Sequence, residues 1–157
     1  MPSFQHEVEL GVSAPTMWNS LKDQNTLFPK LMPEAIASIE MIQGAGEPGT
    51  IRQINFTPMA TANGGFAFVK EKLLSIDLEK FSAVSEEVEG GNKGAFGFTK
   101  WVHEIKIVPV DDKTSKLVFS AEYEGGSEDA ASKAVARAKE YLTKAFKTFE
   151  EHIKSSA

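Results

Sequence analysis

The sequence contains no cysteine, which excludes disulfide bonds. Its three histidines, His6, His103 and His152, show no metal-ligand spacing, so we expect no metal site and no cofactor. No stretch approaches the roughly 18 consecutive apolar residues that a membrane-spanning helix needs. The opening MPSFQHEVEL lacks the apolar core of a secretory signal peptide. We therefore expect a cytoplasmic protein with no membrane partner.

The chain has fewer positively charged residues than negatively charged ones. The chain carries 17 Lys and Arg against 22 Asp and Glu, which gives a net charge of −5 at pH 7. An acidic chain is poorly matched to a phosphate backbone, so we expect no nucleic-acid partner. The 157 residues are 41% hydrophobic and 25% charged, as is ordinary for a soluble globular protein. Repeats and linkers are also missing, and we expect one domain over residues 1–157.

The segment QGAGEPGTI (residues 43–51) has the G-x-G-x-x-G spacing of a dinucleotide-binding loop. Its glycines are Gly44, Gly46 and Gly49. That function requires a helix after the loop, whereas residues 51–56 alternate apolar and polar side chains, as a strand does. Pro48 removes one amide donor, and Glu47 puts a negative charge where a phosphate would lie. The loop is therefore predicted to join two antiparallel strands, with at least one glycine at positive φ and no bound nucleotide.

Period-two alternation predicts seven strands along the chain. In the first strand Phe4, His6, Val8 and Leu10 share one face. Turns are expected at 77–80, 90–94 and 111–113, and a polar loop of small residues at 56–65. The strands, which we expect in meander order, are residues 3–11, 36–43, 50–56, 66–77, 80–91, 95–110 and 115–126.

Three segments indicate helices. Ser13 as N-cap and Pro15 in the first turn predict a short helix, and residues 25–33, ending at a proline, predict a second one. From Ser127 to Ile153 the apolar residues recur every three or four positions, which predicts an amphipathic helix about 40 Å long. One long helix packed on an antiparallel sheet is an α+β architecture.

The stretch LFPKLMPEAIASIEMIQGAGEPGTIRQINF resembles the plant class-10 pathogenesis-related family, the family of the major birch pollen allergen in the START-like helix-grip superfamily. The resemblance continues through FAFVKEKLLSID, VEGG and EIKIV into the last helix, and so covers essentially the whole chain. It implies a helix-grip fold: a seven-stranded antiparallel sheet wrapped around a long C-terminal helix, with two short helices between the first two strands. It also implies a large apolar cavity that takes up flavonoids, fatty acids, steroids, cytokinins and other hormones or metabolites, in a defence or stress role.

The residues give independent support for a cavity. The inward stripe of the last helix is small at Ala131, Ala134 and Ala138 and becomes bulky from Leu142 onward. The eleven phenylalanines could form either the core or a ligand wall, because the two share composition. Alignment with the family places the ligand-binding positions at His6, Val8, Ile36, Phe56, Phe66, Phe68, Glu71, Ala83, Ser85, Phe98, Ala134, Ala138, Tyr141, Leu142 and Ala145.

This sequence departs from the family at three of those positions. The family often has tyrosines where the chain has His6, Ala83 and Ser85, so the resemblance implies a roomier cavity with different polar groups. A polar ligand group could bond to His6, Ser85 or Tyr141. The alternative for His6 is a half-exposed strand histidine without a binding role.

An enzyme is the alternative function. The family has been credited with ribonuclease activity through a lysine, a glutamate and a tyrosine, which fall on Arg52, near Thr99 and on His152, so the carboxylate is missing and we expect no catalytic residues there. Related synthases use a pocket lysine, which Lys70 or Lys72 could supply. We favour a binder of one small amphipathic molecule, as a monomer with a dimer as the alternative. A pocket with a buried carboxylate of strongly shifted pKa would favour an enzyme.

Overall fold

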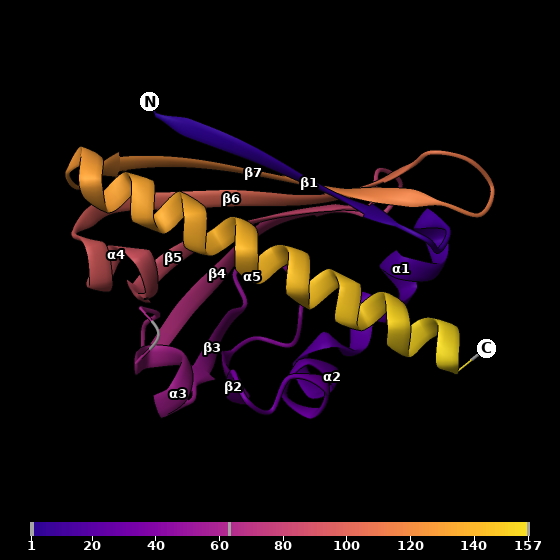
Figure 1. Ribbon diagram of the computed structural model, residues 1–157, viewed down its shortest axis with the longest axis horizontal. Helices are drawn as coiled ribbons and strands as arrows, with labels where there is room; N and C mark the ends of the chain where they lie inside the picture. The colour runs from indigo at the N-terminus through magenta and orange to yellow at the C-terminus, as the bar shows by residue number, and fades with distance from the viewer. Residues whose placement is uncertain (1, 63, 157) are drawn as a thin grey trace.

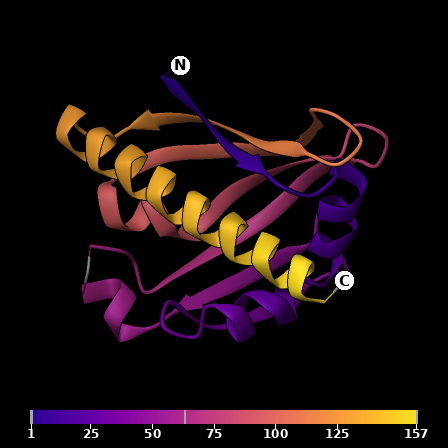
Figure 2. The same ribbon diagram turned by 45° about the vertical axis from the view of Figure 1, so that its right-hand side comes forward.

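The computed structural model describes residues 2–62 and 64–156. Its centre is a seven-stranded antiparallel sheet, and the long helix α5 (Glu128–Ser155) crosses one face of that sheet (Figures 1 and 2). The spatial order is β1-β7-β6-β5-β4-β3-β2. The strands are β1 (Ser3–Leu10), β2 (Ile36–Gln43), β3 (Ile51–Phe56), β4 (Phe68–Asp77), β5 (Ser82–Gly90), β6 (Phe98–Pro109) and β7 (Ser115–Gly125).

The order corrects the expected meander at one strand. From β2 to β7 each strand pairs with the next, but β1 pairs with the last strand, β7, in a continuous antiparallel register from Ser3 opposite Glu122 to Leu10 opposite Ser115. The helices between β1 and β2 carry the chain across to the far edge of the sheet. Sequence alternation predicts that a strand exists, but it does not specify the neighbouring strand.

The turns formed where their residue types predicted. The carboxylate of Asp77 accepts hydrogen bonds from the amides of Glu79 and Lys80, both at 3.0 Å, and that of Asp111 accepts from two following amides at 2.8 Å. Such Asx turns tighten a hairpin. Two other connections correct the prediction, because α3 (Pro58–Ala62) lies in the expected loop and α4 (Gly91–Phe96) replaces the expected turn. Both helices are too short to show a periodic pattern in the sequence.

The glycine-rich loop is a hairpin, as predicted. Gly44, Gly46 and Gly49 adopt φ values of +83°, +115° and +97° between β2 and β3. The Gly46 amide donates to Thr50 Oγ1 at 2.9 Å, and the Ala45 amide donates to Glu47 Oε2 at 3.1 Å. Side chains of the loop itself therefore take amides that a phosphate would need.

Two helices begin at the predicted caps, whereas the second predicted helix begins one residue earlier than expected, at Gln24. Ser13 accepts from the Thr16 amide ahead of α1 (Ala14–Ser20), and Ser127 accepts from the Ala130 amide ahead of α5. A 3₁₀ turn (Leu21–Asp23) links α1 to α2 (Gln24–Leu31). Within the described residues, no helix is both long and apolar enough to cross a membrane.

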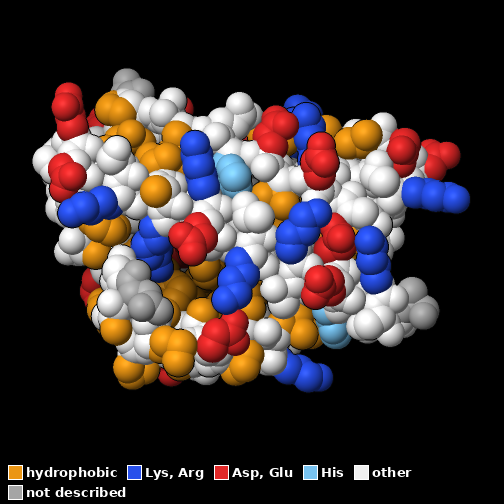
Figure 3. Space-filling view, viewed as in Figure 1, with side chains coloured by type: hydrophobic (Ala, Val, Ile, Leu, Met, Phe, Trp, Pro, Cys, Tyr) orange, Lys and Arg blue, Asp and Glu red, His pale blue; other side chains and the backbone are white. Residues whose placement is uncertain are grey.

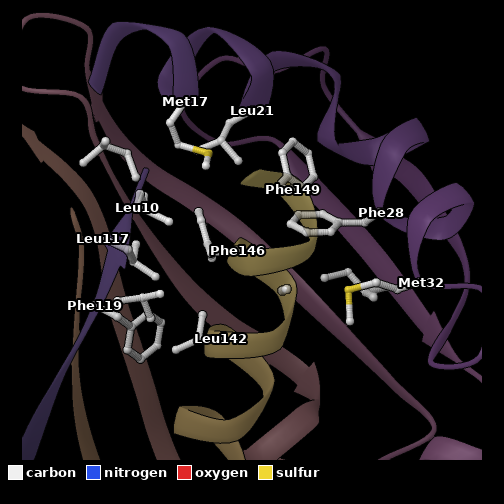
Figure 4. Close-up of a cluster of buried hydrophobic side chains, with 14 of the residues drawn as sticks. Leu10, Met17, Leu21, Phe28, Met32, Leu117, Phe119, Leu142, Phe146 and Phe149 are labelled. Carbon is white, nitrogen blue, oxygen red and sulfur yellow. The ribbon is translucent and has the colours of Figure 1, made fainter. Parts of the chain in front are cut away.

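The solid part of the core lies at the C-terminal half of α5. There α1 and α2 close over the sheet, while α3 and α4 lie near the opposite end of α5 (Figures 1 and 2). Phe149 is fully buried and its ring lies 4.7 Å from that of Phe28, with Met17, Leu21 and Phe146 around them (Figure 4). Space between the sheet and the helix is left at the middle of α5, from Arg137 to Phe146.

Candidate ligand cavity

A cavity of about 450 Å³ lies between the sheet and α5. Every strand from β2 to β7 contributes to its wall, together with α1, α2, α4 and α5. The space-filling view is hollowed between α5 and α3, and the surface inside that hollow is hydrophobic (Figure 3). This volume is in the range of small-molecule sites, which bury most of a ligand among apolar side chains.

Nine of the fifteen positions taken from the family resemblance line this cavity. They come from β3, β4, β5 and α5 and from the segment before β4, and they include the small residues Ala83 and Ala138. The nine are Phe56, Phe66, Glu71, Ala83, Ser85, Ala138, Tyr141, Leu142 and Ala145.

The other six do not line this cavity: His6, Val8, Ile36, Phe68, Phe98 and Ala134. Val8, Ile36, Phe98 and Ala134 are buried in the packed core. On β1 the His6 Nε2 atom lies 2.8 Å from Thr143 Oγ1 on α5, and the side chain is only partly buried. Phe68 lies at the start of β4, where Val69, Glu71 and Leu73 line the cavity, and alternate residues of a strand face opposite ways.

A partly buried ion pair lies in the cavity wall. Arg52 on β3 lies opposite Glu71 on β4, and its Nη2 and Nε atoms donate to Glu71 Oε1 at 3.2 and 3.3 Å. Its Nη1 atom donates to Gln24 Oε1 at 3.0 Å and to Asn25 Oδ1 at 2.7 Å. Arg52 thus joins two strands to α2. Burial pushes the pKa of Glu71 upward, but the charge of Arg52, followed by that of His103 when it is protonated at low pH, outweighs burial and holds this pKa below its usual value.

His103 on β6 completes this polar group. Its Nε2 atom lies 3.6 Å from Glu71 Oε2, and its ring stacks on Phe119 with centroids 5.3 Å apart. Burial lowers the pKa of His103, and although Glu71 opposes that shift, the imidazole is neutral at pH 7. Arg52 therefore carries the charge that pairs with Glu71.

A second carboxylate, Glu87 on β5, lies opposite Glu71 on the neighbouring strand. Asn92 Nδ2 donates to Glu87 Oε2 at 2.9 Å, and the Lys93 amide donates to Oε1 at 3.2 Å. Burial, reinforced by the negative charge of Glu71, raises the pKa of Glu87 to about 7. The cavity thus holds one ionised carboxylate and one that titrates near neutrality.

Aromatic rings and a guanidinium surround another part of the wall. The Arg137 guanidinium lies 4.0 Å from the centroid of Phe66, and Phe66 packs edge-on against Phe56 with centroids 5.3 Å apart. Phe56 also contacts Tyr141 on α5, at 6.2 Å between centroids. Burial, together with the nearby charge of Glu71, raises the pKa of Tyr141 to about 12, so its hydroxyl remains a hydrogen-bond donor at pH 7.

Sequence reasoning missed Glu87, Asn92, His103 and Arg137 as wall residues. The sequence could have indicated Glu87, because alternate residues of a strand share one face. Ala83 and Ser85 were assigned to the inward face of β5, and Glu87 is the next residue on that face. Lys70 and Lys72 have the opposite parity to Glu71, and Lys70 pairs with Glu89 at 3.5 Å instead of entering the cavity. Across residues 2–62 and 64–156, no group of three or more His, Asp or Glu side chains is placed to hold a metal ion.

A sheet gripping one long helix around a cavity defines the class of helix-grip proteins. The profile of the pathogenesis-related protein Bet v 1 family matches residues 1–156, and the chain belongs to that family. It is 32% identical to pathogenesis-related protein 1 of Asparagus officinalis over 154 residues, covering 96% of this chain and 92% of that one. It is 37% identical to major pollen allergen Bet v 1-C of Betula pendula over 131 residues, covering 80% and 78%.

A solved structure has the same fold. Norcoclaurine synthase from Thalictrum flavum, in complex with dopamine and hydroxybenzaldehyde, aligns with a TM-score of 0.77 at 24% sequence identity. The alignment covers 99% of this chain and 88% of that chain. At this level of identity the likeness concerns the fold alone.

Proposed function

We propose that this protein, acting as one domain, reversibly binds a small amphipathic metabolite or hormone in the cavity between the sheet and α5. The observation that carries the proposal is a cavity of about 450 Å³ with a largely apolar wall that also contains polar side chains such as Glu71, Glu87 and Tyr141. Such a wall holds an apolar body by burial and orients it through a small number of polar contacts. Membership of the Bet v 1 family supports the same reading.

The finer part of the proposal concerns ligand type and setting. A cytokinin, flavonoid, steroid or fatty acid would suit a wall of this composition, and a role in plant defence or stress agrees with the pathogenesis-related relatives. We propose a cytoplasmic carrier that works as a monomer, with a dimer as the alternative.

The test is displacement of a solvatochromic dye. The dye ANS should gain fluorescence with the wild-type protein, and apolar plant metabolites should displace it. Ala138→Phe adds a ring inside the wall and should weaken dye binding at least tenfold, or about 1.4 kcal/mol. Ala136→Phe, at an exposed position on the same helix, is the matched control and should bind as the wild type does. Equal binding by both variants would contradict the proposal.

One observation favours an enzyme as the second candidate. Glu87, with a pKa raised to about 7, can donate or accept a proton near neutrality, and ionised Glu71 lies opposite it. Norcoclaurine synthase shares the fold and was solved with dopamine and hydroxybenzaldehyde. Stereoselective condensation of these two compounds by the wild type, lost in Glu87→Gln, would support this candidate. If the product forms no faster with the protein than in buffer alone, this reaction is excluded.

A further inference from the structure

Both arginines of the chain line the cavity, and among the described residues only Arg52 has an acidic partner. Arg137 on α5 takes part in none of the ion pairs or side-chain hydrogen bonds between described residues. The third cation of the wall, Lys22, is exposed. A guanidinium has five N–H donors and no acceptor, so Arg137 can bind an acceptor that its own chain does not supply.

The Arg137 guanidinium lies among residues at the open side of the cavity. Its central carbon is 4.0 Å from the ring centroid of Phe66 and 5.8 Å from that of Phe56, and both rings line the cavity. Its Nη2 and Nε atoms lie 3.1 and 3.3 Å from the position that a Cβ atom would take on Gly65. Gly65 and Phe66 belong to the segment between α3 and β4, and the surface is hollowed between α5 and α3 (Figure 3). Arg137 therefore joins α5 to the segment beside this hollow.

The guanidinium nitrogens of Arg137 are accessible as well as unpaired. Among the described residues, the side-chain atoms that are both fully buried and unpaired are Asn92 Oδ1 and His103 Nδ1, and no nitrogen of Arg137 is one of them. The Arg137 side chain as a whole is half-buried. Burial lowers the pKa of Arg137, although a guanidinium stays protonated at pH 7. The wall thus presents a fixed positive charge whose N–H groups a ligand can reach.

The acidic residues nearest to Arg137 do not neutralise it. The carboxylate oxygens of Glu87 accept hydrogen bonds from Asn92 and from the Lys93 amide, and the pKa of Glu87 is raised to about 7. Three residues further along α5, Glu140 is exposed and belongs to none of the ion pairs between described residues. At about pH 6, where Glu87 is mostly protonated, the charge of Arg137 is therefore without a counter-ion in this part of the wall.

We propose that Arg137 holds the carboxylate of an amphipathic ligand whose apolar body lies against Phe56 and Phe66 inside the cavity. The proposal rests on the proposed binding function and narrows its ligand class to organic carboxylates. A guanidinium binds a carboxylate through two parallel N–H···O bonds, and apolar rings around the pair weaken the competition from water. A neutral head group of the same shape lacks this charge-assisted interaction, so the difference appears as affinity.

Two compounds of the same frame test this assignment: naphthalene-2-carboxylate and naphthalene-2-carboxamide, titrated by calorimetry at about pH 6. Arg137→Gln should weaken binding of the carboxylate by about tenfold or more and leave the affinity for the amide nearly unchanged. Arg137→Lys keeps the charge without the planar fork and should recover part of the loss. Lys139→Gln removes a positive charge from an exposed position of α5 outside this cavity, and should bind both compounds as the wild type does.

The outcomes separate the carboxylate site from the binding function. An equal loss of both compounds in Arg137→Gln would mean that Arg137 only shapes the wall, and an unchanged affinity for the carboxylate would mean that it makes no contact. Either result overturns the carboxylate site and leaves the binding function standing, as does binding of ANS without binding of either naphthalene compound. If the wild type binds neither ANS nor the two compounds, the binding function and the carboxylate site fail together.

A second measurement uses the unaltered protein. Because the chain has two arginines, NMR of their Nε–H groups should give two signals, which are assigned through the backbone resonances of the two residues. Saturating carboxylate should move the signal of Arg137, and the amide should not. The signal of Arg52, whose Nε already donates to Glu71 at 3.3 Å, should move less. An unmoved Arg137 signal at saturating carboxylate also overturns the assignment.

Discussion

Replacing Glu87 by glutamine should change how the stability of the protein depends on pH. Glu87 is 3% exposed, and its pKa is raised from an ordinary 4.5 to about 7. The folded protein therefore binds more protons at this site than the unfolded chain between those two values. The contribution of Glu87 to the free energy of unfolding is fully present below about pH 4.5 and is lost as the pH rises through about 7. Glutamine has no proton to lose and keeps an oxygen and an amide for the local hydrogen bonds.

The magnitude follows from the size of the pKa shift. Each pKa unit corresponds to about 1.4 kcal/mol, so the free energy of unfolding of Glu87→Gln, relative to wild type, should rise by about 2–3 kcal/mol between pH 4.5 and pH 8. For a chain of 157 residues this is a relative gain in melting temperature of about 5–10 °C. Taking the difference between the two proteins cancels other groups that both retain, including His103.

Denaturant titrations at several pH values, followed by the fluorescence of the buried Trp101, measure this difference. Glu86→Gln is the matched control, because Glu86 precedes Glu87 on β5 but does not line the cavity. It should leave the pH profile nearly unchanged. A constant difference between Glu87→Gln and wild type from pH 4.5 to pH 8 would refute the reasoning that burial and Glu71 shift this carboxyl group.

Three more predictions concern the helix, the glycine loop and catalysis. Ala138→Phe should be neutral or stabilising by up to about 2 kcal/mol, because the ring enters a cavity; a lower melting temperature, from overpacking of about 1–3 kcal/mol, would show a filled core. Gly44→Ala should destabilise more than Gly46→Ala in denaturant titrations, because its Cβ would lie 2.6 Å from Thr50 Oγ1 whereas that of Gly46 meets open space; the reverse order would contradict this geometry. Ribonuclease activity of the purified protein should not depend on Arg52 and His152 together, since no hydrogen bond or ion pair between described residues joins them; loss in both alanine variants with folding intact would disprove this.

The sequence alone predicted only part of the position of the cavity. The apolar pattern of α5 could be recognised in the sequence. Its change from small to bulky side chains agrees with the space beside Ala138 and with the packed core at Phe149. Nine of the positions taken from the family resemblance, including Phe56 and Tyr141, lie in the wall. The resemblance also included Phe68, which does not line the cavity, whereas Val69, Glu71 and Leu73 on the same strand do.

The sequence by itself determined the local structure of the chain. The alternation of side chains, the caps Ser13 and Ser127 and the turn residues Asp77 and Asp111 specify strands, helices and hairpins, because each depends on neighbours a few residues away. The glycine loop belongs here too, since its positive φ values are a property of glycine itself.

The tertiary structure decided which distant residues meet. The pairing of β1 with β7 depends on the register between those two strands, and the convergence of Arg52, Glu71, Glu87 and His103 depends on the register from β3 to β6. Register between strands is set by packing of the whole sheet against α5, and a shift of one residue would turn these side chains to the other face. Burial then alters their protonation, and no local pattern in the chain encodes that change.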